Sequence, residues 1–457
     1  MKKILLAVVI LITYSVTSQN KQILYGFDNI PQTLLLNPGA ETNYKYHVGI
    51  PLLSGISAHA NISGFTIADL FRSDNVDFNT KLDNVINQLG NNDYLSINTQ
   101  IEVINAGYQL NEKDYLSVGF YTELDIFSSI PKDFLELLRD GNGVNINRSF
   151  LFTRISTKAD ALGVLHFGIS RKFNEKFIAG GRLKIYSGML NVLSNNNQGS
   201  FTTRLGTNGI YQHTLSNLDL AGYSSGFYNE NGETDLTAKD VLGNAFFGPN
   251  LGLGIDIGFT YKIDEQTEFS ASLLDIGFIG YSDRVRNGTV QGNYVFDGIE
   301  FQYDGTNPNY WQDLNDDLND NIPRSENTES YSVMRPIKFN AALHHYFGKT
   351  RKEATCYDIS YRNYFDNAVG AQLFSVVRPN GPQFAFTGFY QRRLSQKFTT
   401  RVTYTVDDFS YTNFGIGISA HIWKVNLYGA VDNVFNLSDI ADANSASFQF
   451  GINMLFK

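Results

Sequence analysis

The chain repeats one pattern of apolar and polar positions, which is clearest over residues 251–261. Apolar side chains occupy every second position from Leu251 to Tyr261, whereas the positions between them hold glycine, Asp256 and Thr260. Side chains of a β-strand point to opposite faces in turn, so this segment predicts a strand with one apolar face and one small or polar face. Its length, about 33 Å at ~3.3 Å per residue, suits a tilted strand that crosses a membrane.

The same alternation recurs up to the end of the chain. Residues 116–124 and 398–406 show it, and the last segment places Phe448 and Phe456 on its apolar face. A terminal amphipathic strand of this kind allows a barrel to close, because closure removes the unpaired edges of the sheet. Arg401 would cost about 2–4 kcal/mol on a lipid-facing side, so we expect its side chain in the lumen.

Short polar connections predict the order of the strands. Residues 111–114, 174–176 and 264–266 have the length and composition of hairpin turns, which make neighbours in sequence pair antiparallel. We therefore predict an all-β fold, a transmembrane antiparallel up-and-down β-barrel of about 14 strands, in the range of about 12 to 16, with short helices in long loops and an N-terminal hatch segment. A soluble β-sandwich also alternates and is the alternative fold.

Four long connections interrupt the alternation, and we expect them not to form strands. They are residues 64–93, 127–157, 190–249 and 281–336. Connections of this length in a compact domain are usually functional or mobile rather than simple spacers. In a bacterial barrel, such long loops lie on the extracellular side and short turns lie on the periplasmic side.

Apolar residues at helical spacing predict short helices inside these connections. One helix covers residues 82–89, and it lies either in a loop or in a plug inside the barrel. Another begins after Pro131 and ends at Gly141. A third would offer three apolar side chains to a partner protein: Trp311, Leu314 and Leu318.

The N-terminus predicts export from the cytoplasm. Lys2 and Lys3 precede an apolar run over residues 4–12, so we expect residues 1–18 to be a signal peptide that is cleaved after Ser18. The apolar run is too short to span a membrane as a helix.

Residues 19–43 then form an N-terminal strap or hatch, and residues 44–457 form the barrel. The hatch contains Asn37, Pro38 and Gly39, a turn sequence that excludes a regular helix or a central strand there. It is either a capping strap under the barrel or a gate and ligand latch.

Composition excludes several classes of protein. The net charge of −9, without basic clusters, argues against binding of nucleic acid. Cys356 is the single cysteine, which excludes an internal disulfide and a thiolate metal cluster. The mean hydropathy of −0.20, with no long apolar run after the signal, excludes a helical membrane protein. The 35 Phe, 26 Tyr and 40 Gly residues fit a barrel with aromatic girdles.

No constellation for catalysis stands out. The acidic run over residues 313–320 lacks the glycine and closing glutamate of an EF-hand, so a solvated helix face explains it better than calcium does. His344 and His345 are neighbours that face opposite sides of a strand and cannot easily share one metal ion. Neither a serine-nucleophile elbow nor an HExxH sequence is present. We expect no enzyme, no metal site and no cofactor.

Several of these segments resemble a known family. Asn37, Pro38 and Gly39 resemble the Asn-Pro-Ala segment at the start of FadL-like outer-membrane barrels. Residues 30–38, 272–279 and 432–434 are similar to stretches of a FadL-like barrel family from gliding, type IX-secreting bacteria. The resemblance extends over essentially the whole mature chain. Gly39 departs from it, because the family pattern has alanine there.

This resemblance implies a location and two alternative functions. FadL carries long-chain fatty acids through a lateral opening and uses an N-terminal hatch. The resemblance therefore implies a porin-like channel or carrier in the outer membrane, with a hydrophobic or small amphipathic ligand held near Asn37, Pro38 and Gly39. The alternative is an accessory barrel of the type IX secretion or gliding machinery. The expected partners are outer-membrane lipid and either a small hydrophobic ligand or a secretion or surface-machinery protein, but no nucleic acid.

Overall fold

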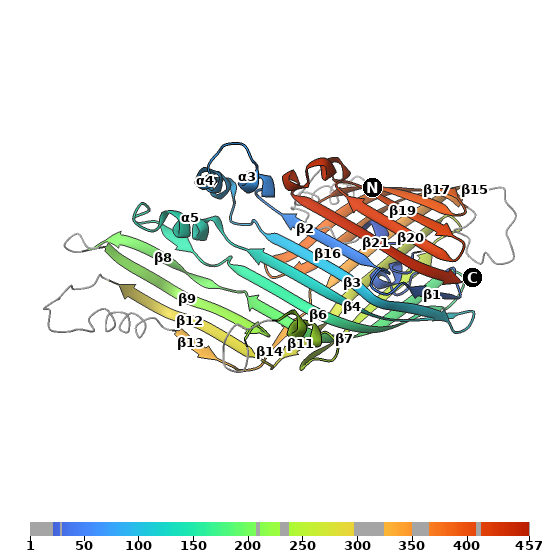
Figure 1. Cartoon of the computed structure of the whole chain (residues 1–457), viewed down its shortest axis with the longest axis horizontal. Helices are drawn as coiled ribbons and strands as arrows, with labels where there is room; N and C mark the ends of the chain where they lie inside the picture. Colours follow the sequence, from blue (N-terminus) through green and yellow to red (C-terminus); the bar gives the residue numbers. More distant parts are fainter. Residues whose placement is uncertain are drawn as a thin grey trace, which may run out of the picture.

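The chain folds into a closed β-barrel, from which part of the sheet continues as an extension (Figure 1). The computed structural model describes residues 22–27, 30–206, 211–228, 237–296, 324–349, 365–407 and 413–456. Over these residues the barrel has 14 antiparallel strand positions, and the first position closes against β21. The predicted fold class and strand number are thereby confirmed.

Two of the strand positions are each shared by two shorter strands, which lie end to end. The order around the barrel is β1 (Tyr46–Gly49) with β2 (Ile56–Ile62), β3 (Leu95–Gln109), β4 (Asp114–Ser129), β6 (Ser156–Lys172), β7 (Phe177–Ser194), β10 (Asn250–Lys262), β11 (Thr267–Tyr281), β14 (Tyr331–Met334) with β15 (Lys338–Lys349), β16 (Phe365–Arg378), β17 (Gly381–Ser395), β18 (Phe398–Val406), β19 (Asn413–Ile422), β20 (Val425–Asp432) and β21 (Ser445–Phe456).

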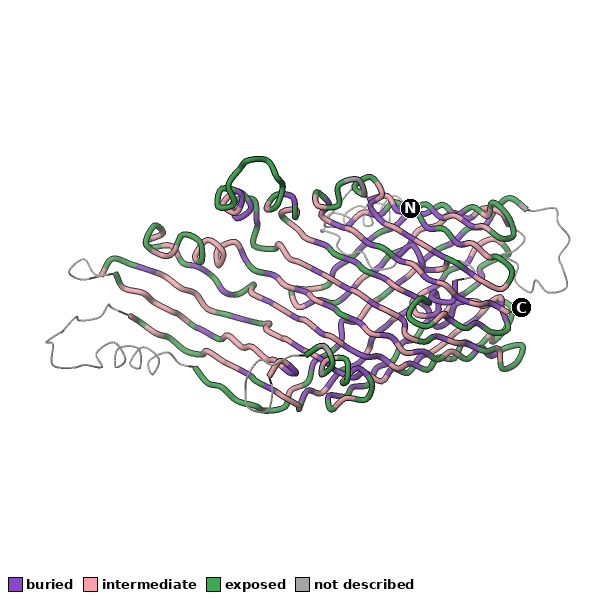
Figure 2. The backbone as a smooth tube through the Cα atoms, in the orientation of Figure 1, coloured by how far each residue is buried: buried purple, intermediate pink, exposed green. Residues whose placement is uncertain are grey.

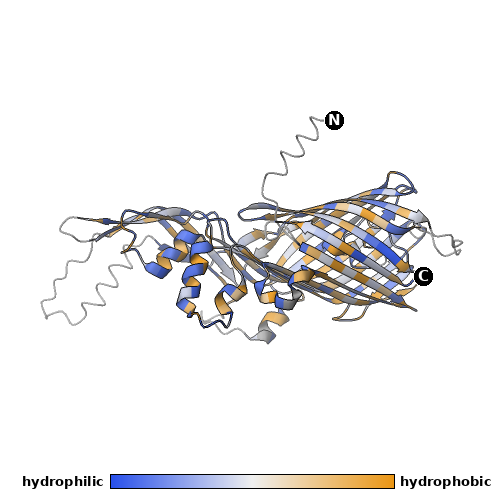
Figure 3. Ribbon diagram, turned by 90° about the horizontal axis from the view of Figure 1, so that it is seen from above, coloured by the Kyte–Doolittle hydropathy of each residue, from blue (hydrophilic) through white to orange (hydrophobic). Residues whose placement is uncertain are grey.

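The wall is apolar on its outer face and polar on its inner face. In β10, Leu253 points outward with 54% of its surface exposed, whereas Asp256 points inward and is fully buried. Buried and exposed positions alternate along the strands in Figure 2, and polar and apolar residues alternate in Figure 3. Arg401 is also buried inside the barrel, as predicted. This polarity is the reverse of that in a soluble protein and is the polarity of a transmembrane barrel.

The two ends of the barrel differ in their connections. One end carries short turns, and we call it the short-turn end. Its turns after β3, β6 and β10 are closed by Asn111, Asn174 and Asp264. Each side chain accepts hydrogen bonds from the main-chain N–H groups two and three residues further along, with distances of 2.7 to 2.9 Å. This arrangement fixes a tight turn. The three hairpin turns predicted from the sequence are therefore present. The opposite end is the long-loop end.

Short helices flank the long-loop end or lie inside the barrel. They are η1 (Gln22–Leu24), α2 (Thr33–Leu36), α3 (Ile67–Phe71), α4 (Phe78–Gln88), α5 (Lys132–Asp140), α6 (Ala238–Gly243) and η4 (Val434–Asp442). Among the described residues, no helix is both long enough and apolar enough to cross a membrane.

The helices predicted near residues 82–89 and after Pro131 correspond to α4 and α5. Pro131 precedes α5, and Gly141 ends it with a φ of +70° that few other residues adopt. Arg139 of α5 donates to Asp83 of α4 at 2.6 Å, which lowers the pKa of the Asp83 carboxyl. Because α4 packs with α3 and α5 at the long-loop end (Figure 1), it is not part of a plug.

Five strands form the extension beyond the long-loop end. Their order is β5 (Ser149–Leu151), β8 (Gln198–Leu205), β9 (Tyr211–Ser225), β12 (Val285–Phe296) and β13 (Arg324–Asn327). The extension joins the barrel where β9 pairs with the end of β7.

The extension corrects one prediction. Residues 127–157, 190–249 and 281–336 were expected to lack strands, but among them they contain β5, β8, β9, β12, β13 and the barrel strand β14. Both faces of β9 are about equally exposed, so neither face requires apolar residues. Its sequence therefore lacks the alternation of apolar and polar residues that reveals a strand. Residues 1–18 and the predicted loop residues Trp311, Leu314 and Leu318 lie outside the described residues.

A charge on the outer face of the barrel should be costly only where lipid contacts the wall. We expect Leu253→Arg to lower the free energy of unfolding in lipid vesicles by about 2–4 kcal/mol. Leu205→Arg, at an exposed site on β8 in the extension, should change it by less than about 0.5 kcal/mol. Denaturant titrations in vesicles measure both values, and equal effects would contradict a lipid-facing position for Leu253.

Candidate functional site

A segment near the N-terminus lies inside the barrel and contacts walls on opposite sides. We call residues 22–27 and 30–44 the hatch. Its first part contacts β18, β19 and β20, its middle contacts β7 and β10, and its end packs against β4 before the chain enters β1. The hatch, the dark blue helical segment inside the barrel in Figure 1, therefore crosses the lumen.

Arg401 of β18 holds the first part of the hatch by its main chain. Its guanidinium donates hydrogen bonds to the carbonyl oxygens of Ile23, Tyr25 and Gly26 at 3.0, 2.7 and 2.8 Å. The guanidinium also lies 4.8 Å from the ring centroid of Phe27, in the geometry of a cation–π contact. The five donors of a planar guanidinium suit this task, because several carbonyls can be bound from one side chain.

Wall side chains bind the middle of the hatch in the same way. Arg182 donates to the carbonyl oxygen of Leu34 at 2.6 Å, and Ser272 donates to that of Leu36 at 2.6 Å. Side chains of the hatch contribute as well: Gln32 exchanges hydrogen bonds with the amide of Asn453 at 3.1 and 3.0 Å and donates to Glu102 at 2.8 Å, and Glu41 pairs with Lys262 at 3.0 Å. The hatch is therefore recognised through its main-chain carbonyls and through a few polar side chains.

The Asn37–Gly39 turn is buried against the barrel wall. The Asn37 amide donates to the carbonyl oxygen of Phe259 at 3.1 Å, while its oxygen accepts from the N–H of Gly39 at 2.9 Å. Asn37 is 4% exposed. Asn37, Pro38 and Gly39 therefore anchor the hatch. A Cβ at Gly39 would lie 2.6 Å from the Cα of Phe259, which explains why this chain has glycine where the FadL-like pattern has alanine.

Two glycines of the wall make room for this turn. Gly180 of β7 and Gly258 of β10 are cross-strand partners. A Cβ at Gly180 would overlap the carbonyl oxygen of Pro38, and one at Gly258 would overlap the side-chain oxygen of Asn37. We call this pair the glycine pad. It allows the hatch main chain to approach the wall more closely than any side chain would permit.

The hatch also covers an apolar part of the lumen. Four of its side chains form a buried cluster with two residues of β20: Ile23, Leu24, Phe27, Ile30, Tyr428 and Ala430. Burial raises the pKa of Tyr25 to about 12, so its hydroxyl stays neutral at physiological pH. Releasing the hatch would thus expose aromatic and aliphatic surface inside the barrel.

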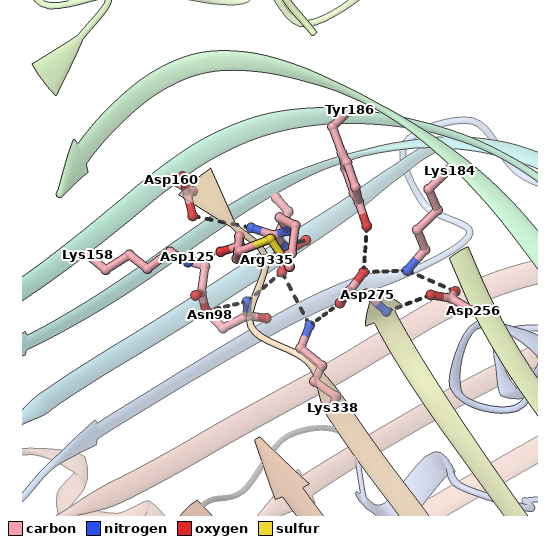
Figure 4. Close-up of polar contacts among 12 residues, drawn as sticks. Asn98, Asp125, Lys158, Asp160, Lys184, Tyr186, Asp256, Asp275, Arg335 and Lys338 are labelled. Atoms are coloured by element: carbon pink, nitrogen blue, oxygen red, sulfur yellow. Dashed lines mark hydrogen bonds and ion pairs between the residues drawn. The ribbon is translucent and has the colours of Figure 1, made fainter. Parts of the chain in front are cut away.

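A network of ion pairs spans the lumen on the long-loop side of the hatch (Figure 4). Asp275 lies between Lys184 and Lys338, with N–O distances of 2.6 and 2.9 Å. Arg335 pairs with Glu123 across the lumen at 2.8 Å. We call this the lumen network, and it includes further pairs: Arg335–Asp160, Lys184–Asp256 and Arg378–Asp125.

Arg182 connects the lumen network with the hatch. Its guanidinium contacts Asp256 at 3.3 Å as well as the carbonyl oxygen of Leu34. Asp256 in turn accepts from the main-chain N–H of Asp275 at 2.8 Å, where a bulge between β10 and β11 holds Asp275 at a φ of +60°. A displacement of the hatch at Leu34 therefore removes one partner from a charge in the network.

The cavities beside the hatch are small. One of about 20 Å³ borders Tyr25 and Asn37, and another of about 30 Å³ lies between Leu36 and Lys338. Each can hold water but not a hydrocarbon ligand. With the hatch in this position, a larger ligand can enter these sites only after the hatch moves. Within the described parts of the chain, no group of three or more His, Cys, Asp or Glu side chains could hold a metal ion.

Comparison with protein families assigns the chain. A family model described as "Family of unknown function (DUF5723)" matches residues 38–432. The chain belongs to this family. The matched range begins inside the Asn37–Gly39 turn and includes the glycine pad and the lumen network. No curated protein matches the chain.

Solved structures with similar folds include transporters and other barrels. The toluene transporter TbuX of Ralstonia pickettii has a TM-score of 0.45 at 10% identity, and the match covers 98% of this chain and 100% of TbuX. A FadL homologue of Pseudomonas aeruginosa has 0.43 at 9%, covering 97% and 100%. The translocator domain of the autotransporter NalP from Neisseria meningitidis has 0.31 at 6%, covering 90% and 88%. Similarity at this level does not assign a function to members of DUF5723, and these matches provide no link to type IX secretion or gliding.

The glycine pad offers a test of the hatch position with a matched control. Gly180→Ala should displace the Asn37–Gly39 turn, because its Cβ would overlap the carbonyl oxygen of Pro38. Gly181→Ala should not, because the nearest atom to its Cβ would be 3.7 Å away. In a Cys356→Ser background, the labelling rate of Leu35→Cys by a membrane-impermeant maleimide measures access to the hatch. Equal rates in the two alanine variants would contradict the close approach.

Removal of the Arg401 guanidinium should loosen the first part of the hatch. Arg401→Met leaves three buried carbonyls without their donor, at about 1–3 kcal/mol for each. We expect faster hydrogen exchange of residues 22–27, measured by mass spectrometry in detergent. Arg392→Met, at an exposed site on β17, is the control and should leave the exchange unchanged. Exchange in Arg401→Met as slow as in the wild type would show that other contacts hold this part.

Proposed function

We propose that this protein is an outer-membrane channel or carrier for a hydrophobic or small amphipathic compound, and that the hatch is its gate. The protein acts without catalysis or a cofactor. The observation that carries the proposal is the way in which the hatch is held, with its main-chain carbonyls bound by Arg182, Ser272 and Arg401 of the wall.

These contacts support a segment that can leave and return. Water can replace a carbonyl as the acceptor for an arginine or serine of the wall, so the net free energy of each contact is only about 0.5–3 kcal/mol. Main-chain recognition together with the glycine pad gives one defined closed position.

The surface under the hatch supports an apolar ligand. When Ile23, Leu24 and Phe27 move away, Tyr428 and Ala430 of β20 lose their apolar partners. An apolar compound can replace these contacts, because burial of its surface is favourable by about 25 cal/mol per Å². Polar groups at the edge of the site, such as Gln32 and Asn453, would then orient an amphipathic ligand.

The fold supports the location and the orientation. A transmembrane barrel with a predicted signal peptide at residues 1–18 belongs in the outer membrane of a bacterium. The short-turn end then faces the periplasm, and the extension projects from the cell. The hatch lies in the periplasmic half of the lumen, near the start of β1 and the end of β21.

The extension favours a second candidate function, a barrel that binds a partner protein. Its strands project beyond the long-loop end, and an added chain could pair with β13, which pairs with β12 alone among the described residues. An accessory role in type IX secretion or gliding would be one form of this function. A stoichiometric protein that co-purifies with the wild type, and is lost when residues 285–327 are removed, would favour it over transport.

Transport through the barrel should require two openings. We expect Gly180→Ala combined with Arg401→Met to bind an apolar fluorescent probe in detergent more tightly than the wild type, because together they release the Asn37–Gly39 turn and the first part of the hatch, which covers the apolar surface. Flux of the probe through proteoliposomes should rise further when Arg378→Gln is added, because this weakens the Arg378–Asp125 pair across the lumen.

The controls separate these effects from a loss of folding. Gly181→Ala should match the wild type in binding and flux. Heat-modifiable migration on gels shows whether each variant still forms a barrel. If Gly180→Ala with Arg401→Met releases the hatch, as shown by the labelling of Leu35→Cys and by faster hydrogen exchange of residues 22–27, but binds no additional probe, the hatch does not gate an apolar site.

A further inference from the structure

One segment leaves the barrel wall and runs over its outer face. Asn250, the first residue of β10, donates to the hydroxyl of Ser225, the last residue of β9, at 3.1 Å. Both strands pair with β7, one after the other, and therefore occupy one column of the wall. Residues 237–249 lie outside this column and include α6 at the junction of barrel and extension (Figure 1).

The outer wall has a built site for this segment. Ser187 of β7 faces outward, and its hydroxyl donates to the carbonyl oxygen of Asn244 and accepts from the N–H of Gly248, each at 2.7 Å. Its cross-strand partner is Gly163 of β6, where a Cβ would overlap the carbonyl oxygen of Ala245. A serine and a glycine thus replace the large apolar residues that face outward elsewhere on these strands.

The segment carries exposed apolar side chains beside the outer wall. Leu242, Phe246 and Phe247 are 64%, 57% and 54% exposed. The ring of Phe246 packs edge-on against Phe120 of β4 at 5.3 Å between centroids. Phe120 faces the same side as the exposed Val118, on the outer wall of the barrel. The exposed rings therefore continue the lipid-facing surface.

The height of the segment matches one boundary of a membrane. An aromatic row near the short-turn end joins Phe173, Phe177, Phe259 and Phe269, with centroids 5.8 to 6.1 Å apart. Ser187 lies about ten residues further along β7 than Phe177, or about 33 Å along the strand. At a tilt of about 40° this is a height of about 25 Å, which is the usual height of the apolar band of such barrels.

We propose that residues 237–249 are an interfacial anchor, which inserts Leu242, Phe246 and Phe247 at the lipid boundary nearest the long-loop end. The partner is membrane lipid, because the rings continue the lipid-facing wall at the height where acyl chains meet headgroups. In transmembrane barrels, girdles of aromatic residues flank the apolar band at both interfaces. The anchor would fix the height of the barrel, with the extension held outside the membrane. This inference does not depend on gating by the hatch.

The test uses tryptophan as a probe of depth. In a Trp311→Phe, Trp423→Phe background, Phe246→Trp and Phe247→Trp are placed in vesicles that contain lipids brominated close to the headgroup. We expect most of their emission to be quenched and blue-shifted. Leu205→Trp on β8, which lies in the extension, should remain unquenched. A partner protein at this surface would leave Phe246→Trp unquenched in the pure bilayer, which would overturn the proposal.

A second comparison tests the built site itself. Adding Gly163→Leu to Phe246→Trp should displace the segment and reduce the quenching severalfold. Gly222→Leu on β9 is the matched control, because a Cβ at Gly222 would have no atom within 4 Å, and it should leave the quenching unchanged. Heat-modifiable migration shows whether each variant still folds. Equal quenching in the two leucine variants of folded protein would overturn the docking at Gly163 and Ser187.

Discussion

The structure depends on one constraint, the inward direction of the polar side chains. A membrane barrel must present apolar groups to lipid, and the alternation of a strand then places every second side chain in the lumen. A buried charge or hydrogen-bonding group without a partner costs several kcal/mol. Arg182 and Arg401 are both buried, so the interior must supply acceptors for them. The hatch supplies carbonyls, and the lumen network supplies carboxylates.

This division explains why the hatch and the lumen network differ in chemistry. The hatch presents main-chain carbonyls, which are neutral acceptors that water can replace. Ion pairs such as Arg335–Glu123 are harder to separate, because separation leaves a charge in a medium of low polarity. The described part of the hatch before Glu41 is therefore held without ion pairs, whereas Glu41 itself pairs with Lys262. The lumen network sets the distance between opposite walls, as Arg378 and Asp125 do between β16 and β4.

The sequence predicted the features that contact with lipid requires, and it missed the features that depend on contacts between distant parts of the chain. The faces of β10 and the inward position of Arg401 follow from period-two alternation, and the turns at Asn111 and Asp264 follow from local chemistry. The hatch partners of Arg401 lie more than 370 residues away and are main-chain carbonyls, which every residue has. Its other partner is the side-chain oxygen of Gln391 on the neighbouring strand β17. The strands of the extension and the position of α6 were missed because neither has a lipid-facing period. The role of Ser187 and Gly163 in binding residues 244–248 is visible only in the structure, where the two residues are cross-strand partners.

The hatch and the lumen network lie one behind the other along the lumen, and Arg182 contacts both. If the hatch leaves, Arg182 loses the Leu34 carbonyl but keeps Asp256, so its charge remains paired and the wall stays intact. The first opening can thus occur without breaking an ion pair of the lumen network, and only the Glu41–Lys262 pair near the end of the hatch separates if that part also moves. This opening uncovers the apolar surface of β20 on the short-turn side, while the network still closes the other side. A ligand bound there would face one compartment at a time, which is how a barrel can pass a solute without ever forming an open pore.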